Sequence, residues 1–480
     1  MMYANCTNRF RQGMRQRCSS VCHVSFGLAE WKTMDKRFFV LSRPMSFSGG
    51  LYNPGRKMIP FDSKNKPSHS FQSAEKKKKS PVKNEKNEFY SEVRKTSDVV
   101  ESKEGGADKF IKGEVLDYSI NLRTARPGTY IKIPYELTLT ESLSDFWQSS
   151  FHSQDRIHTS TPFARALGLQ DRVMPFSLVL FLTSAMSHED SAKVQVGFGR
   201  CIYQWPVFAG DTVRKTFQVL SVRNTSDGNH SIIHFACNLI NQRNRVCMSA
   251  DKRLLFEFPV PESNVTIDAD SEGVPQLFRD HLLSKSHVLS SGELESHSLI
   301  PLRQGNLILH TLVRSITFAQ SQQLASLARL THERHFDIRK YDVKTEIFVP
   351  AGLVLGLTMS AANRDFHEAL HEELVNVSYV HHLHPGDVVS AFSYVSNVNE
   401  NLPGDLESVT VRTIGVKNMD VVNDLDGVSI PMELLETDKT YTKAVEQICK
   451  NLCPKLANKV ITVVDRKIIR QSNRREVFLL

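Results

Sequence analysis

The pattern of hydrophobic and polar positions along this chain is first typical of a buried helix and then of several strands, and this order occurs twice. Each time, a stretch that is apolar nearly all round follows a proline, at Pro175 to Met186 and at Pro350 to Ala362. A helix that is apolar on every side must be buried. Runs rich in β-branched and aromatic residues come next, bounded by turn residues such as Gly210-Asp211. The pattern therefore predicts, in each half, one buried helix followed by long antiparallel strands.

The remaining elements are predicted from the same periodicity. A short helix is expected ahead of each central helix, at Glu141 to Phe151 after Thr140 and at Thr317 to Leu330. Threonine is a favoured N-cap because its side chain accepts a hydrogen bond from the first turn. A helix from Thr442 to Cys453 is expected near the end. The predicted strands cover 194–204, 212–223, 231–239, 246–258, 375–382, 388–398, 408–416, 428–436 and 460–464.

The two halves are copies of one another. Pro175-Phe-Ser-Leu-Val-Leu-Phe-Leu-Thr183 recurs as Pro350-Ala-Gly-Leu-Val-Leu-Gly-Leu-Thr358, with six of nine positions identical. Self-similarity at a fixed offset indicates a duplicated unit. Three flanking landmarks recur at an offset of 176 or 177, namely Thr140 and Thr317, His158 and His335, and Gly210 and Gly386.

Length and charge set the domain organisation. A chain of 480 residues has room for two or three domains. Its first 60 residues carry ten Lys or Arg against two acidic residues, which is typical of an organellar presequence, so we expect import into the mitochondrial matrix. We expect a leader over 1–50, a disordered basic linker over 51–112, a first domain over 113–260, a linker over 261–305, a second domain over 306–438 and a helical, basic extension over 439–480.

Cysteine, histidine and hydropathy patterns argue against several classes of protein. Eight cysteines in a chain of this length do not form a disulfide framework. The histidines at 381, 382 and 384 alternate along a predicted strand and therefore point apart, so no metal site is expected. No stretch offers the roughly 18 apolar residues of a membrane span, so none is expected.

One stretch of the first half carries a family resemblance. Ile157-His-Thr-Ser-Thr-Pro-Phe-Ala-Arg-Ala-Leu-Gly-Leu169, followed by Pro206-Val-Phe-Ala-Gly-Asp-Thr212, resembles the mesaconyl-CoA hydratase or methylmalyl-CoA dehydratase branch of the MaoC-like hydratases. The resemblance implies an α+β tandem, or double, hotdog fold, in which an antiparallel sheet wraps a long central helix in each half. The fused pair would itself reproduce the hotdog dimer, so the chain could act as a monomer or form a further dimer.

The resemblance also implies a reaction, the addition or removal of water across the C2=C3 bond of an enoyl thioester. Such a site needs an acid, a base and backbone N–H groups that polarise the thioester carbonyl. The substrate would be a thioester of CoA or of acyl carrier protein, and no cofactor is implied. The candidate catalytic residues are His158, Asp155, His335 and Glu333, and the thioester would lie at Ala351, Gly352 and Leu353.

The spacing of the catalytic pair departs from that of the wider family, in which an Asp precedes the His by five residues. Here Ser153 and Leu330 occupy those positions, so Asp155 or Glu333 would have to replace the missing carboxylate. Two interpretations remain open. The chain is either an acyl-CoA hydratase or dehydratase, or a double hotdog without catalysis that serves in a mitochondrial assembly and binds acyl carrier protein, RNA or a ribosome-associated complex through its basic extensions.

Overall fold

The computed structural model describes residues 113, 120–186, 192–261, 263–267, 275–289 and 301–471. The predicted leader over 1–50 and the linker over 51–112 lie outside these residues, as does part of the linker over 261–305. Among the described residues, every helix falls short of the length and hydropathy that a membrane span requires.

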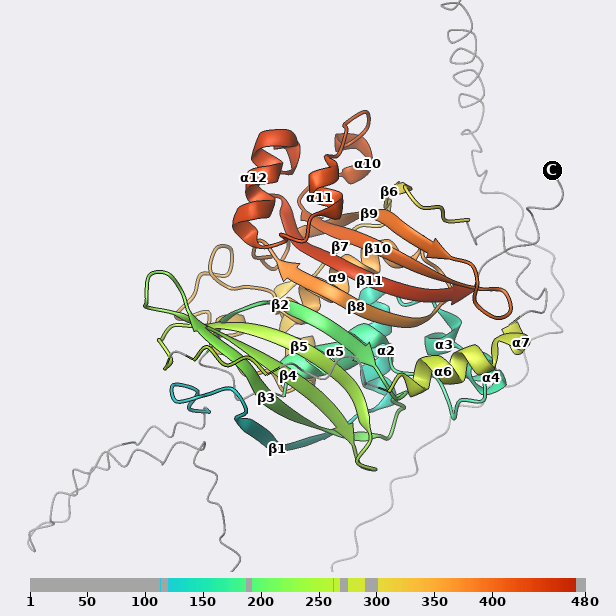
Figure 1. Ribbon diagram of the computed structural model, residues 1–480, viewed down its shortest axis with the longest axis horizontal. Helices are drawn as coiled ribbons and strands as arrows, with labels where there is room; N and C mark the ends of the chain where they lie inside the picture. Colours follow the sequence, from blue (N-terminus) through green and yellow to red (C-terminus); the bar gives the residue numbers. More distant parts are fainter. Residues whose placement is uncertain are drawn as a thin grey trace, which may run out of the picture. The chain divides into compact units, whose positions relative to one another are not determined.

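The first half follows the predicted plan (Figure 1). Helix α2 begins after Thr140, whose hydroxyl accepts a hydrogen bond from the Leu143 amide as expected of an N-cap. The central helix α5 is buried on nearly all sides because its sequence, FSLVLFLTS, is almost entirely apolar. The elements of this half are β1 (Tyr130–Thr138), α2 (Glu141–Phe151), α3 (Arg156–Thr159), α4 (Thr161–Ala166), α5 (Phe176–Ser184), β2 (Ala192–Tyr203), β3 (Thr212–Asn224), β4 (Ser231–Asn241), β5 (Val246–Phe256), α6 (Leu277–Ser284) and α7 (Ser286–Leu289).

The second half repeats this plan, with Thr317 as the N-cap of its first helix. Its central helix buries eleven of thirteen residues. The elements are β6 (Leu307–Leu309), β7 (Arg314–Ser315), α8 (Phe318–Leu327), η1 (Glu333–His335), α9 (Ala351–Asn363), β8 (Ala369–Tyr379), β9 (Val388–Asn399), β10 (Leu406–Lys417), α10 (Val421–Asp424), α11 (Met432–Glu436), α12 (Thr442–Leu452), η2 (Pro454–Leu456) and β11 (Val460–Gln471).

The strands of both halves form one antiparallel sheet. Its order is β1-β3-β4-β5-β2-β8-β11-β10-β9-β6, with β7 on β9. The two halves meet where β2 pairs with β8, through Gly197 opposite Ser378 and Phe198 opposite Val377. We call this junction the seam. Helices α5 and α9 contact each other across it, and one hydrophobic core contains residues of both. The predicted α+β double hotdog is confirmed.

The end of the chain differs from the prediction. The expected strand at 428–436 is wrong, because Pro431 there begins the short helix α11. The sheet instead includes β11, of which only 460–464 was predicted. This strand lies between β8 and β10, so the sheet continues well past residue 438, where we expected the domain to end. Helix α12 packs its buried Val445 and Cys449 on this half of the sheet.

Two arginines of the predicted basic extension are buried in the sheet. Arg466 and Arg470 of β11 are each 1 % exposed. Arg466 pairs with Glu372 at 3.0 Å and Arg470 with Glu407 at 2.6 Å. Both guanidinium groups stabilise the interior of the sheet and cannot provide a surface for RNA.

Candidate active site

The two candidate histidines occupy equivalent positions and make the same hydrogen bond. Nδ1 of His158 lies 2.9 Å from the Val173 carbonyl oxygen, and Nδ1 of His335 lies 2.8 Å from that of Phe348. Each carbonyl belongs to the residue two positions before the proline that begins the central helix. Burial lowers the pKa of both histidines to about 4, so both rings are neutral at pH 7. A neutral ring that donates from Nδ1 has its acceptor at Nε2, where a general base needs it.

The cavities beside these histidines differ in size. The cavity at His158 has a volume of about 10 Å³, which is room for roughly one water molecule. The cavity at His335 has a volume of about 120 Å³. The first is filled by aromatic side chains of Trp147, Phe151 and Phe176. At the equivalent positions the second half has Leu324, Ala328 and Ala351, so the two copies share a scaffold and differ in the size of the cavity.

The cavity at His335 includes the start of the second central helix. Of the three residues expected at the thioester, Ala351 and Gly352 line this cavity and Leu353 does not. The Leu353 amide instead donates to the Pro350 carbonyl at 2.8 Å. Pro350 gives the helix no side-chain cap, so its N-cap side chain satisfies none of the first N–H groups of α9.

Neither candidate carboxylate lies beside His335. Glu333 is about half exposed and accepts hydrogen bonds from Lys340 at 2.6 Å and Tyr341 at 2.7 Å. These contacts lower the pKa of Glu333, and the residue does not line the cavity. Among the described residues, the lining of the His335 cavity contains no carboxylate.

Asp155 has a structural partner at the seam. Its Oδ1 accepts a hydrogen bond from the Ala369 amide, at the start of β8, at 2.9 Å. The equivalent residue of the second half is His332, whose Nε2 lies 2.7 Å from the carbonyl oxygen of Ala192, at the start of β2. The two contacts are the same bond in the two copies with donor and acceptor exchanged. Burial, with Glu372 nearby, raises the pKa of Asp155 to about 8.

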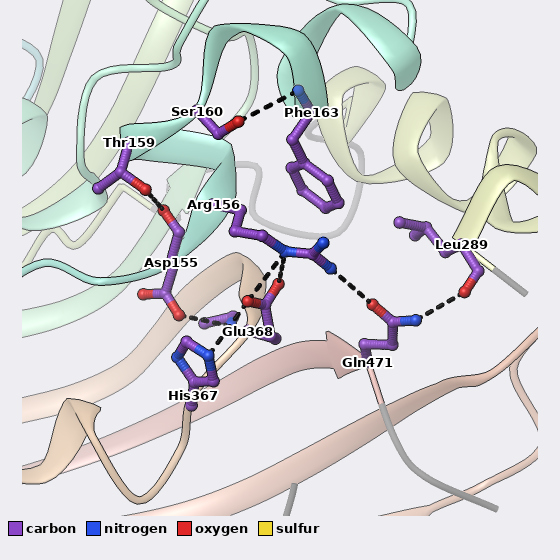
Figure 2. Close-up of polar contacts among 10 residues, drawn as sticks. Asp155, Arg156, Thr159, Ser160, Phe163, Leu289, His367, Glu368 and Gln471 are labelled. Atoms are coloured by element: carbon purple, nitrogen blue, oxygen red, sulfur yellow. Dashed lines mark hydrogen bonds and ion pairs between the residues drawn. The ribbon is translucent and has the colours of Figure 1, made fainter. Parts of the chain in front are cut away.

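The start of the motif that carried the resemblance packs against a polar contact between the two halves (Figure 2). Ser160 caps α4 by accepting from the Phe163 amide, and the Phe163 ring lies 4.1 Å from the guanidinium of Arg156. Arg156 donates to both carboxylate oxygens of Glu368 at 3.0 and 3.1 Å and reaches Gln471 of β11. Arg156, the residue just before the motif, thus joins the first half to the second, and Phe163 of the motif packs on its guanidinium group.

The three histidines at 381, 382 and 384, which could have suggested a metal site, each contact a different partner. His381 pairs with Glu446 at 2.6 Å, and His384 bonds the Ile347 carbonyl. The His382 ring stacks on Phe348 with the ring centres 3.9 Å apart. Within the described ranges, no group of three metal-ligating side chains is present.

Two polar residues that line the cavity at His335 were not predicted from the sequence. Gln195 of β2 and Tyr379 of β8 line it from opposite sides of the seam. The sequence did contain a signal for Tyr379, because it stands 176 residues after Tyr203 and thus recurs with the repeat.

Comparisons with known proteins agree with the resemblance seen in the sequence. No family model matches the chain. It is 24% identical to the beta-methylmalyl-CoA dehydratase of Chloroflexus aurantiacus over 325 residues, 63% of this chain and 91% of that protein. It is also 24% identical to the mesaconyl-CoA hydratase of Cereibacter sphaeroides over 310 residues, 61% of this chain and 88% of that protein.

Solved structures agree at the level of the fold. A candidate MaoC domain dehydratase from Chloroflexus aurantiacus superposes with a TM-score of 0.59 at 18% identity, covering 75% of this chain and 100% of that chain. A Mycobacterium tuberculosis protein with a double hotdog fold superposes with a TM-score of 0.53 at 14% identity, covering 73% and 99%. The expected resemblance to MaoC-like double hotdogs is confirmed.

Proposed function

We propose that this chain, a double hotdog of the MaoC-like type, binds an acyl thioester in the cavity of its second half and adds or removes water across the C2=C3 bond there. The observation that carries the proposal is the joint placement of His335 and the start of α9 in one cavity of about 120 Å³. The names of the two curated relatives, a hydratase and a dehydratase of CoA thioesters, support the same reaction class.

The proton transfers can be assigned to one residue. In hydration, Nε2 of His335 takes a proton from water while the water oxygen bonds to C3. The electron pair of the C2=C3 bond moves toward the thioester carbonyl, and N–H groups of Ala351 and Gly352 stabilise the charge on its oxygen. The imidazolium then returns its proton to C2, so the ring ends neutral. Dehydration is the reverse, and no cofactor takes part.

The two histidines provide a matched pair of variants. His335→Asn keeps an N–H donor for the Phe348 carbonyl but removes the Nε2 base, and His158→Asn makes the same change at the closed cavity. The full chain is assayed with crotonyl-, mesaconyl- and longer enoyl-CoA thioesters. We expect His335→Asn to lower turnover about 10²- to 10⁴-fold and His158→Asn to leave it within a few-fold of the parent.

Three other results would contradict the proposal. Loss of turnover in His158→Asn alone would move the site to the first half. Turnover equal to that of the parent in both variants would show that neither histidine is the base. A parent protein that binds thioesters without converting them would instead support the interpretation in which the fold is retained without catalysis.

A further inference from the structure

The end of the first strand after each central helix carries the same residue in both halves. Tyr203 ends β2, Tyr379 ends β8, and they are 176 residues apart, as are Gly210 and Gly386. The two tyrosines are therefore copies of one ancestral position. They allow a direct comparison of what each half does with the same hydroxyl group.

In the first half the hydroxyl is part of the fold. Tyr203 donates to the Met174 carbonyl at 3.1 Å and accepts from the Val207 amide at 3.1 Å. Its side chain is 1 % exposed. These bonds fix the segment before α5 against the segment that follows β2.

In the second half the same hydroxyl is left over. The matching backbone segments are joined directly in both halves, by the Met174 amide donating to the Val207 carbonyl at 2.8 Å and the Val349 amide donating to the Leu383 carbonyl at 2.9 Å, but the second half does not add the tyrosine hydroxyl to this contact. The Tyr379 hydroxyl is buried and has no hydrogen-bond partner among the described residues, and the residue lines the cavity at His335. Burial raises the pKa of Tyr379 well above its usual value, so the hydroxyl stays protonated and able to donate.

A second unpaired donor lies in the same cavity. Oε1 of Gln195 accepts from the Ser184 hydroxyl at 2.9 Å, which holds the amide, while its Nε2 is buried with no partner in the described part of the chain. A buried polar group without a partner is costly, so two of them in one cavity indicate a ligand that satisfies them. The amide nitrogen of Gln195 can only donate, so the partner that it lacks must be an acceptor. An acceptor also suits the Tyr379 hydroxyl.

We infer that Tyr379 and Gln195 donate hydrogen bonds to the carbonyl oxygen of the bound thioester. This inference rests on the proposed function, since it names the groups that recognise the substrate in that cavity. The donors come from different halves, Gln195 from β2 and Tyr379 from β8, so the recognition site is complete only across the seam. Together with the start of α9, they form a set of donors for an oxygen that gains negative charge during the reaction.

The test uses two CoA derivatives that differ at the relevant oxygen. Butyryl-CoA has the thioester carbonyl but no double bond to hydrate, and S-butyl-CoA is the thioether without that oxygen. The affinity of the full chain for each is measured by calorimetry. We expect the parent to prefer butyryl-CoA, and Tyr379→Phe to reduce this preference roughly 3- to 10-fold, the effect of one neutral hydrogen bond.

Tyr203→Phe is the matched control. Because its hydroxyl bonds the backbone, this variant should lose a few degrees of Tm and keep the preference for butyryl-CoA. Tyr379→Phe should keep or slightly raise Tm, since no protein partner is lost. Gln195→Leu should reduce the preference like Tyr379→Phe.

The outcomes separate this inference from the proposed function. A parent that binds neither derivative contradicts the proposed function itself. A parent that binds butyryl-CoA with a preference that survives both Tyr379→Phe and Gln195→Leu contradicts the inference alone, and leaves the start of α9 as the site of the carbonyl. A fall in Tm for Tyr379→Phe as large as that of Tyr203→Phe would assign both hydroxyls to the fold.

Discussion

Single residues at equivalent positions of the two copies have taken different roles. Asp155 and His332 make mirror-image hydrogen bonds at the seam, and Tyr203 and Tyr379 differ in whether the fold uses the hydroxyl. Asp155 was a candidate catalytic residue on sequence grounds, and Tyr379 could have been singled out because it recurs with the repeat. The comparison within the chain thus separates structural from functional residues.

Asp155 should reduce stability as the pH rises. Its folded pKa of about 8 lies above the ordinary value of 3.8, so the folded state holds a proton that the unfolded state releases between these values. The associated stability is present below pH 4 and is lost as the pH rises to 8. Asp155→Asn keeps an acceptor for the Ala369 amide without an ionisable group. Its stability relative to the parent should grow with pH, by at most about 1.4 kcal/mol per unit.

Urea unfolding of both proteins at pH 4.5, 6 and 8 measures this difference. Glu333→Gln is the control, because that carboxylate is half exposed and paired at the surface, where ion pairs contribute little. An Asp155→Asn variant that is less stable than the parent at pH 8 would show that the ionised carboxylate stabilises the seam.

The pKa of His335 sets the pH dependence expected of catalysis. The ring is neutral above a pKa of about 4, and the neutral form is the base. We therefore expect kcat/KM for enoyl-CoA hydration to stay level from about pH 5.5 to 8 and to fall as the pH approaches 4. Circular dichroism at each pH controls for unfolding. A rise of kcat/KM toward acid pH would show that the imidazolium, and not the neutral ring, is the active form.

At the scale of the helices, the two central helices approach closely because glycine faces an aromatic ring. A Cβ at Gly352 would come closer to the Phe181 ring than van der Waals contact permits. Gly352→Ala should therefore destabilise the protein by about 1 to 3 kcal/mol, measured by thermal unfolding. The double variant Gly352→Ala, Phe181→Leu should recover part of this loss, since a smaller neighbour leaves room for the methyl group. Additive losses in the double variant would contradict this packing.

The elements that repeat were predictable from the sequence, and those that depend on distant partners were not. The apolar run FSLVLFLTS identifies a buried helix without further information. The basic extension over 439–480 was instead expected outside the domain, because Glu372 and Glu407, the partners of Arg466 and Arg470, are 94 and 63 residues away. Local periodicity does not contain such pairings, and so β11 was predicted as a short strand outside the domain.

The candidate site was predictable in part for the same reason. The repeat singled out His335 and the start of α9, because both recur at a fixed offset within the chain, and the structure has both in the lining of one cavity. It could not show that the loop after His332 turns Glu333 toward Lys340 and Tyr341. Nor could it show that Trp147, Phe151 and Phe176 close the first cavity, since filling depends on how helices from both halves meet.

At the scale of the molecule, the two halves form one folding unit whose last strand lies inside the sheet. β11 pairs with β10 along Leu406 to Val416 and with β8 along Ala369 to Tyr379. Its removal would expose both neighbours and leave the buried carboxylates of Glu372 and Glu407 without their arginine partners. Breaking a buried ion pair by removing one partner costs about 3 to 5 kcal/mol, a large share of the stability of a typical domain.

A chain that ends at residue 438 should therefore fail to fold, although the sequence pattern alone would place the domain end there. A chain that ends at residue 471 is the control, because it keeps β11 and every described contact. We expect the longer chain to unfold in one cooperative transition, with the calorimetric and van't Hoff enthalpies equal, since a single core spans both halves. The shorter chain should show no such transition. A shorter chain with a cooperative transition at the same Tm would mean that β11 is an addition to a sheet that is complete without it.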